Sequence, residues 1–142
     1  MARAMTAEPG KALETRLRLR ESGRILVTVS GGCMIPTLRE GQQVLVTVKR
    51  PRVGDVALLE ARGWLEIHRL VARIDAGPRE WFVHMGDGSF EFGLAGPQDI
   101  LGRVEVGTRR GPAACRAHLW ALGLRVGALL RRMGLPLSGH FC

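Results

Sequence analysis

The sequence predicts a mostly β domain, in which a curled antiparallel sheet or partial barrel follows a short helix and precedes an amphipathic one. Two observations lead to this fold class. Short runs rich in β-branched residues recur through the middle of the chain, and turns that contain Gly or Pro separate them. Many short strands with frequent turn signals are typical of antiparallel sheets and barrels. The expected strands are residues 25–30, 44–48, 56–60, 65–74, 80–85 and 100–106.

Residues 11–22 (KALETRLRLRES) predict a helix before the first strand. They contain neither Gly nor Pro, Leu13 and Leu17 stand one helical turn apart, and Gly23 is expected to end the helix. The chain is therefore divided into a basic N-terminal helix or arm over 1–24, a β-domain over 25–108, and a basic amphipathic segment over 109–142.

The C-terminal segment predicts an amphipathic helix over 113–135. Six apolar residues fall on one stripe of a helical wheel, with cationic residues beside them. Two interpretations stay open: a helix lying in a membrane interface, or one packed on the β-domain. A spanning helix is disfavoured because Arg125 would stand near its centre. The stripe consists of Leu119, Leu122, Val126, Leu129, Leu130 and Met133.

The net charge of +8 on 142 residues is concentrated at the two ends. Residues 1–24 carry six basic and three acidic residues, and residues 103–142 carry seven and one; the middle is about neutral. Basic flanks favour contact with an anionic membrane surface or an acidic partner, or they simply maintain solubility. Nucleic acid is not expected as a partner, because a neutral β-domain lacks the basic face such proteins present.

The cysteine count and the N-terminus predict a cytoplasmic protein, with peripheral membrane association left open. Three cysteines show no framework spacing, there is no signal-peptide core, and no apolar run reaches 18 residues. A zinc set could be drawn from Cys115, His118, His140 and Cys142, but its spacing fits no familiar finger. We therefore expect no metal and no cofactor.

Cys33 is the first candidate for chemistry. It lies in S-G-G-C-M-I-P-T-L, residues 30–38, directly after an expected strand. Two glycines let the chain turn sharply and approach a substrate closely, as a presented nucleophile requires. Considered locally, a structural thiol remains the alternative.

The segment V-S-G-G-C-M-I-P-T-L resembles the nucleophile box of type I signal peptidases and related signal-peptidase-like peptidases, S-x-S-M-x-P-T-L. Further pieces follow in the order of that family, over roughly residues 25–106. Residues 40–46 (EGQQVLV) resemble a G-D-x-V-x-V strand of the family, and residues 52–56 (RVGDV) resemble its R-x-G-D-I/V turn. Residues 67–71 (IHRLV) resemble the segment that carries the general base. Residues 84–88 (HMGDG) resemble a K-G-D-N element, and residues 100–104 (ILGRV) resemble an I-x-G-K-V strand.

The resemblance implies a signal-peptidase-like fold and a catalytic dyad. Cys33 takes the position of the serine nucleophile, and His68 takes the position of the base, which is Lys or His in different branches. A thiol beside an imidazole can form a thiolate–imidazolium pair and act near neutral pH. A third, acidic residue would orient His68, and Asp87 and Glu91 are the candidates.

An extended peptide is the substrate that the resemblance implies. It would pair with the strand before the nucleophile, so the expected contacts are Val27, Thr28, Val29, Ser30, Gly32 and Met34. One departure concerns position 31, where the family often has a hydroxyl residue that helps bind the oxyanion and this chain has Gly31.

The sequence thus predicts an endopeptidase that cleaves a precursor or leader peptide, or a preprotein, through a Cys–His dyad. The alternative is a catalytically inactive peptide-binding module of the same fold. A self-cleaving, repressor-like protein is disfavoured, because the residues before the first strand are too few for a DNA-binding domain and the base is not lysine.

Overall fold

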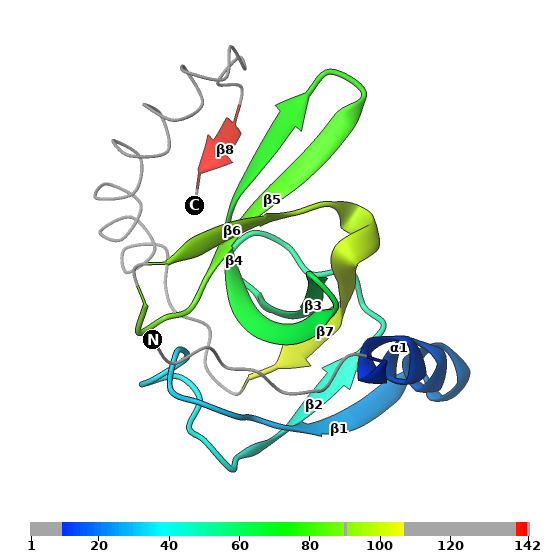
Figure 1. The fold of residues 1–142 in the computed structure, drawn as a ribbon. Coiled ribbons are helices and arrows are strands. Elements are labelled where there is room, and N and C mark those ends of the chain that lie inside the picture. Colours follow the sequence, from blue (N-terminus) through cyan, green and yellow to red (C-terminus); the bar gives the residue numbers. More distant parts are fainter. Residues whose placement is uncertain (1–9, 90, 107–138, 142) are drawn as a thin grey trace.

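The fold is described from a computed structural model, which covers residues 10–89, 91–106 and 139–141. Within these ranges a single helix precedes the strands (Figure 1). The elements are α1 (Lys11–Ser22), β1 (Arg24–Thr28), β2 (Gln43–Thr47), β3 (Val56–Ala61), β4 (Trp64–Ala76), β5 (Arg79–Met85), β6 (Phe92–Ala95), η1 (Pro97–Asp99), β7 (Ile100–Glu105) and β8 (Gly139–Phe141).

The strands form one antiparallel sheet in the order β1-β2-β7-β3-β4-β5-β6. The two end strands, β1 and β6, do not pair with each other, so the path of the described strands curls without closing (Figure 1). The short strand β8 pairs with β4 beside this path. The prediction of a mostly β, antiparallel domain is confirmed.

All six expected strands are present, with ends displaced by one to a few residues. Two strands were not predicted, β6 and β8. The sequence of β6 is only F-G-L-A, too short and too exposed to show alternation. The amphipathic helix expected over 113–135 lies outside the described residues.

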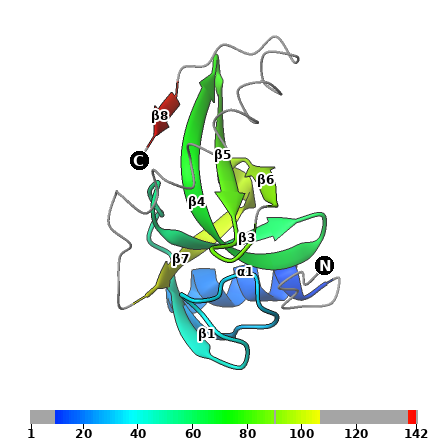
Figure 2. The same cartoon turned by 90° about the vertical axis from the view of Figure 1, so that its left-hand side faces the viewer.

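Strand β4 is the longest and connects two parts of the sheet. Its first half pairs with β3, and its second half pairs with β5 and β8. The register with β5 shifts between Leu70 and Ala72, at an irregularity that bends such strands. Figure 2 shows the β4–β5 ribbon rising away from the curled part of the sheet. The site described below lies where this ribbon leaves β3.

Alternation along β3 and β4 separates two apolar clusters, because successive side chains of a strand point to opposite faces. On one face Val56, Leu58, Leu65 and Ile67 belong to the main core, together with Val46 and Val104. On the other face Ala57 and Leu59 form a smaller cluster with Leu70 and Phe82.

Helix α1 spans Lys11–Ser22, as predicted, and ends at Gly23, whose φ of 73° is the left-handed conformation that glycine adopts readily. Its buried side chains are Ala12 and Leu19, which belong to the main core cluster. Leu13 and Leu17, which stand one helical turn apart, are 63% and 49% exposed. The helix is therefore packed on the β-domain through the face that carries Ala12 and Leu19, and not through Leu13 and Leu17.

Candidate active site

The loop between β1 and β2 holds Cys33 through its own backbone hydrogen bonds. The amide of Ile35 donates to the carbonyl of Gly32, and the amide of Leu38 donates to that of Met34. The side chain of Met34 is completely buried in the main core. Because this neighbour is fixed in the core, the position of the thiol is fixed with it.

A second loop, residues 86–89, packs directly on the first. The amide of Gly88 donates to the carbonyl oxygen of Cys33 at 2.8 Å. A Cβ atom at Gly86 would lie 2.4 Å from that same oxygen, closer than any real contact allows. The approach of the two loops therefore requires a residue without a side chain at position 86.

The sulfur of Cys33 lies 3.4 Å from Nε2 of His68, on β4. The two residues are 35 positions apart in the sequence, and the fold brings their side chains together. This distance is within the range for a hydrogen bond to sulfur, so a proton can pass between thiol and imidazole. The structure thus brings together the two residues that the sequence singled out as nucleophile and base.

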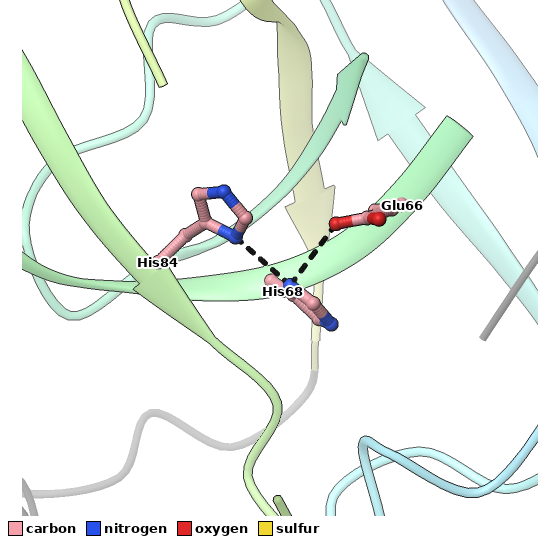
Figure 3. Close-up of side chains that lie close together, drawn as sticks. All are labelled: Glu66, His68 and His84. Carbon is pink, nitrogen blue, oxygen red and sulfur yellow. Dashed lines mark hydrogen bonds and ion pairs between the residues drawn. The ribbon is translucent and has the colours of Figure 1, made fainter. Parts of the chain in front are cut away.

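The other ring nitrogen of His68 faces two further groups (Figure 3). Its Nδ1 lies 2.9 Å from Nδ1 of His84 on β5 and 3.5 Å from Oε2 of Glu66. The His68 and His84 rings are stacked at an interplanar angle of 30°. Glu66 precedes His68 by two residues in β4, so both side chains lie on one face of the strand.

This arrangement assigns protons when His68 acts as a base. If Nε2 accepts the proton of the Cys33 thiol, the single proton of neutral His68 stands on Nδ1. That Nδ1–H then donates to Nδ1 of His84, which leaves the proton of neutral His84 on its Nε2.

Both imidazoles are neutral at pH 7. The pKa of His68 is lowered from 6.5 to about 4, chiefly by burial and in addition by repulsion from His84, while the charge of Asp87 opposes the shift. Burial also lowers the pKa of His84 to about 4, with Asp99 opposing. His68 is therefore a neutral imidazole beside the Cys33 sulfur at pH 7.

A pocket of about 320 Å³ opens onto these side chains. Cys33, His68, His84 and Glu66 all line it, as do Arg62 and residues of β6. A larger pocket of about 740 Å³ lies elsewhere and contains none of these four residues. Arg50 and Arg73, which line the larger pocket, form ion pairs with Glu80.

Asp87, one candidate for the third residue, lies in a buried ion pair. Its carboxylate accepts two hydrogen bonds from Arg69, at 2.7 and 2.6 Å, and another from the hydroxyl of Thr37. Arg69 also donates to the carbonyl of Gly54 at 2.6 Å. These contacts join the 86–89 loop to β4 and to the loop of Cys33, and Asp87 reaches His68 through its charge.

Glu91, the other candidate, is exposed and lines the same pocket. Its backbone amide donates to the hydroxyl of Ser89. The groups placed against Nδ1 of His68 are instead Glu66 and His84.

The expected substrate-binding residues fall into two groups. Val27, Thr28, Ser30 and Gly32 lie in or after β1, a strand at one end of the described sheet that pairs with β2 alone. The side chains of Val29 and Met34 are buried in the core, and the backbone amide and carbonyl of Val29 form hydrogen bonds with Gln42 and Gly41. An extended peptide could add to the other edge of β1.

Sequence reasoning missed Glu66 and His84 as site residues. The two-residue spacing from Glu66 to His68 would have placed them on one face of the expected strand. His84 joins them only through the register of β4 and β5, in which Leu70 is opposite His84. The same three side chains also form a set that could hold a metal ion.

Comparisons with known proteins leave the chain without a recognised relative: no family model, no curated protein and no solved structure matches it. Among the described residues, no helix is long and apolar enough to cross a membrane.

Proposed function

We propose that the protein is a signal-peptidase-like endopeptidase, in which Cys33 is the nucleophile and His68 is the general base. The observation that carries the proposal is the 3.4 Å approach of Cys33 Sγ to His68 Nε2 at the edge of a pocket. The order of the similar segments along the chain supports the family. The curled antiparallel sheet is compatible with it.

The reaction needs Nε2 of His68 to take up and release a proton twice. As the sulfur attacks the carbonyl carbon of the peptide, His68 Nε2 takes the thiol proton. The C–N bond then breaks as that proton passes to the leaving amine, and a thioester to Cys33 remains. Nε2 next takes a proton from water, whose oxygen attacks the thioester. The C–S bond breaks, the carboxylic acid leaves, and the proton on Nε2 returns to the sulfur to restore the thiol.

Glu66 and His84 position the base. The imidazolium that forms during the attack carries a positive charge, and Glu66 Oε2 at 3.5 Å from its Nδ1 stabilises that charge. Nδ1 of His84 accepts a hydrogen bond from Nδ1–H of His68 and so holds Nε2 toward the sulfur. This pair takes the role for which an acidic residue was expected after residue 86.

The proposed substrate is an extended segment of a precursor or leader peptide. Its backbone would pair with the free edge of β1 in the described sheet, and the bond to be cut would reach the pocket beside Cys33. The pocket lining contributes Glu60, Glu66, Glu91 and Asp99 against Arg62. This excess of acidic side chains favours peptides with basic residues near the cut.

The test is incubation of the full chain with a pool of proteome-derived peptides, in the presence of a chelator, followed by mass spectrometry of new termini. We expect Cys33→Ala and His68→Ala to reduce cleavage by about 10³-fold or more, as for other nucleophile and base removals. Cys115→Ala is the matched control and retains cleavage. If the two site variants produce the same new termini as the wild-type chain, the peptidase proposal fails.

One observation favours the second candidate function, a peptide-binding module without catalysis. Cys33 is only 7% exposed, which restricts the approach of a carbonyl carbon to its sulfur. In that case the peptide pool is retained uncut, and Cys33→Ala leaves its retention unchanged.

A further inference from the structure

Three ligand-type side chains converge on one side of the proposed dyad. Nδ1 of His68, Nδ1 of His84 and a carboxylate oxygen of Glu66 all lie within 4.8 Å of one another. They are carried by two paired strands, β4 and β5, whose register fixes their spacing. Figure 3 shows the imidazole of His84 and the carboxylate of Glu66 directed at the same nitrogen of His68.

These distances suit a small divalent cation. Two nitrogen ligands of tetrahedral zinc, each about 2.0–2.1 Å from the metal, are separated by about 3.3 Å. The distance from Nδ1 of His68 to Nδ1 of His84 is 2.9 Å, and the distance from the same nitrogen to Oε2 of Glu66 is 3.5 Å. These two distances lie on either side of the expected value. Two imidazoles and one carboxylate form a ligand set that zinc accepts with one position left open.

The surroundings favour a cation as well. Besides Glu66 itself, the pocket that leads to the cluster is lined by Glu91, Asp99 and Glu60, the last of which pairs with Arg16, and by Arg62. Imidazole nitrogens and carboxylate oxygens are both ligand types that zinc accepts in proteins.

We propose that Glu66, His68 and His84 bind a Zn²⁺ ion, with the fourth position open to the pocket, and that the bound ion holds the dyad inactive. The binding stands on the geometry of the cluster alone. The inactivation rests on the proposed peptidase function.

Inactivation follows from the proton of His68. When Nδ1 binds the metal, the single proton of the neutral ring moves from Nδ1 to Nε2. Nε2–H then faces Cys33 and cannot accept the thiol proton. No proton is gained or lost in this change, and the hydrogen bond between the two histidines is replaced by two bonds to the metal.

Binding is tested by calorimetric titration of ZnCl₂ into the full chain with Cys115→Ser and Cys142→Ser, which remove the thiols outside the described residues. One ion is expected to bind. His84→Gln and Glu66→Gln are expected to weaken it about 100-fold and at least about 10-fold, since even outer-shell losses cost 10–100-fold. Glu91→Gln, in the same pocket, is the matched control and leaves the affinity within about twofold of the parent.

The binding proposal is overturned if no stoichiometric ion binds, or if Glu66→Gln binds as tightly as the Glu91→Gln control. Should His84→Gln fail to fold, as judged by circular dichroism, the comparison of these two glutamate variants decides the question.

Inactivation is tested on the peptide pool, with and without one equivalent of ZnCl₂. We expect zinc to abolish the cleavage that depends on Cys33, and a chelator to restore it. Cleavage that zinc leaves unchanged or accelerates overturns the inactivation even where the ion binds. A pool that stays uncut with chelator present counts against the peptidase proposal, while the calorimetric result on zinc stands separately.

Discussion

At the scale of single residues, His68 is defined by what lies on each of its two nitrogens. Nε2 faces the sulfur of Cys33, and Nδ1 faces His84 and Glu66. In a neutral imidazole, the nitrogen that carries the proton is a hydrogen-bond donor, and the other nitrogen is left as the acceptor. The chemistry of the site therefore depends on which neighbour holds Nδ1.

In the proposed peptidase, the pH dependence of cleavage would follow from the low pKa of His68. The acid limb of kcat/KM reports the base of the free enzyme, so it is expected near pH 4 when a chelator is present. His84→Gln removes a positive charge that opposes protonation of His68, and it moves the limb to higher pH. A limb near 6.5 in the wild-type chain would show that His68 is not the buried base described here.

Gly86 tests the contact between the two loops. Gly86→Ala places a methyl group 2.4 Å from the carbonyl oxygen of Cys33, so one loop must move. We expect a loss of about 1–3 kcal/mol in the free energy of unfolding, typical of overpacking, and a loss of peptide cleavage.

The control for this substitution is Gly96→Ala, whose Cβ would lie nearest to the far end of the exposed side chain of Gln98, which can turn away. Its unfolding free energy is expected within about 0.5 kcal/mol of wild type by urea denaturation. Equal losses in both variants would contradict the role of close loop packing.

At the scale of elements, the 86–89 loop is anchored through Asp87. The Arg69 and Asp87 side chains are only 3% and 4% exposed, so removing one charge leaves the other buried without compensation. Asp87→Ala is expected to destabilise the fold by about 3–5 kcal/mol, measured by urea denaturation. The exposed pair is the control: Asp75→Ala, which leaves Arg73 its ion pair with Glu80, is expected to cost at most about 1 kcal/mol.

The same variant separates an anchoring role from a catalytic one. If Asp87 anchors the loop, Asp87→Ala lowers the free energy of unfolding together with peptide cleavage. If Asp87 is a catalytic acid, the substitution lowers cleavage and leaves the free energy of unfolding unchanged. The second result would restore Asp87 as the third catalytic residue.

Helix α1 contributes to the core through one face. Leu19→Ala is expected to reduce the free energy of unfolding by about 2–5 kcal/mol, because a completely packed side chain is replaced by a cavity. Leu17→Ala, two residues earlier on the exposed face, is expected to change it by at most about 0.5 kcal/mol. Chemical denaturation of both variants measures the difference. Equal effects would contradict the burial of Leu19 and the exposure of Leu17.

At the scale of the whole molecule, the two histidines link folding to pH. Each has a pKa of about 4 in the folded protein and 6.5 when unfolded, so the unfolded chain binds more protons between these values. Their full contribution to stability is present above pH 6.5 and is lost as the pH falls toward 4. Each histidine accounts for a loss of about 3 kcal/mol over that range.

Urea denaturation across pH 4 to 7, with a chelator present, measures this loss. His84→Gln is expected to remove part of the slope, because its side chain no longer titrates. A wild-type stability that is flat across this range would contradict the buried, neutral state of both rings.

The order of the elements could be predicted from the sequence because short-range signals determine it. Gly23 marks the end of α1, and β-branched runs mark the six strands of the middle region. Which face of α1 is buried could not be predicted, because Leu13 and Leu17 are spaced as a buried pair would be and are nevertheless exposed. Which face is covered depends on β1 and β4, which lie later in the chain.

The site was predictable in part for the same reason. Cys33 and His68 were identified from local segments and their order. The partners of His68 Nδ1 depend on strand register, which the sequence does not show directly. His84 reaches this nitrogen because β5 pairs with β4 around an irregularity at Leu70–Ala72. Asp87 was a candidate for orienting the base. Its carboxylate instead forms an ion pair with Arg69, the residue directly after His68 in the chain.

The hydrogen bond from the amide of Gly88 to the carbonyl of Cys33 has a consequence for the chain during its synthesis. A chain that has emerged only as far as β2 carries Cys33 without His68, and one that ends at β4 lacks the loop that holds the cysteine in place. Cys33 therefore acquires its partner only when residues 33, 68 and 88 are all in position. In the proposed peptidase, the capacity to cleave would then arise together with completion of the fold.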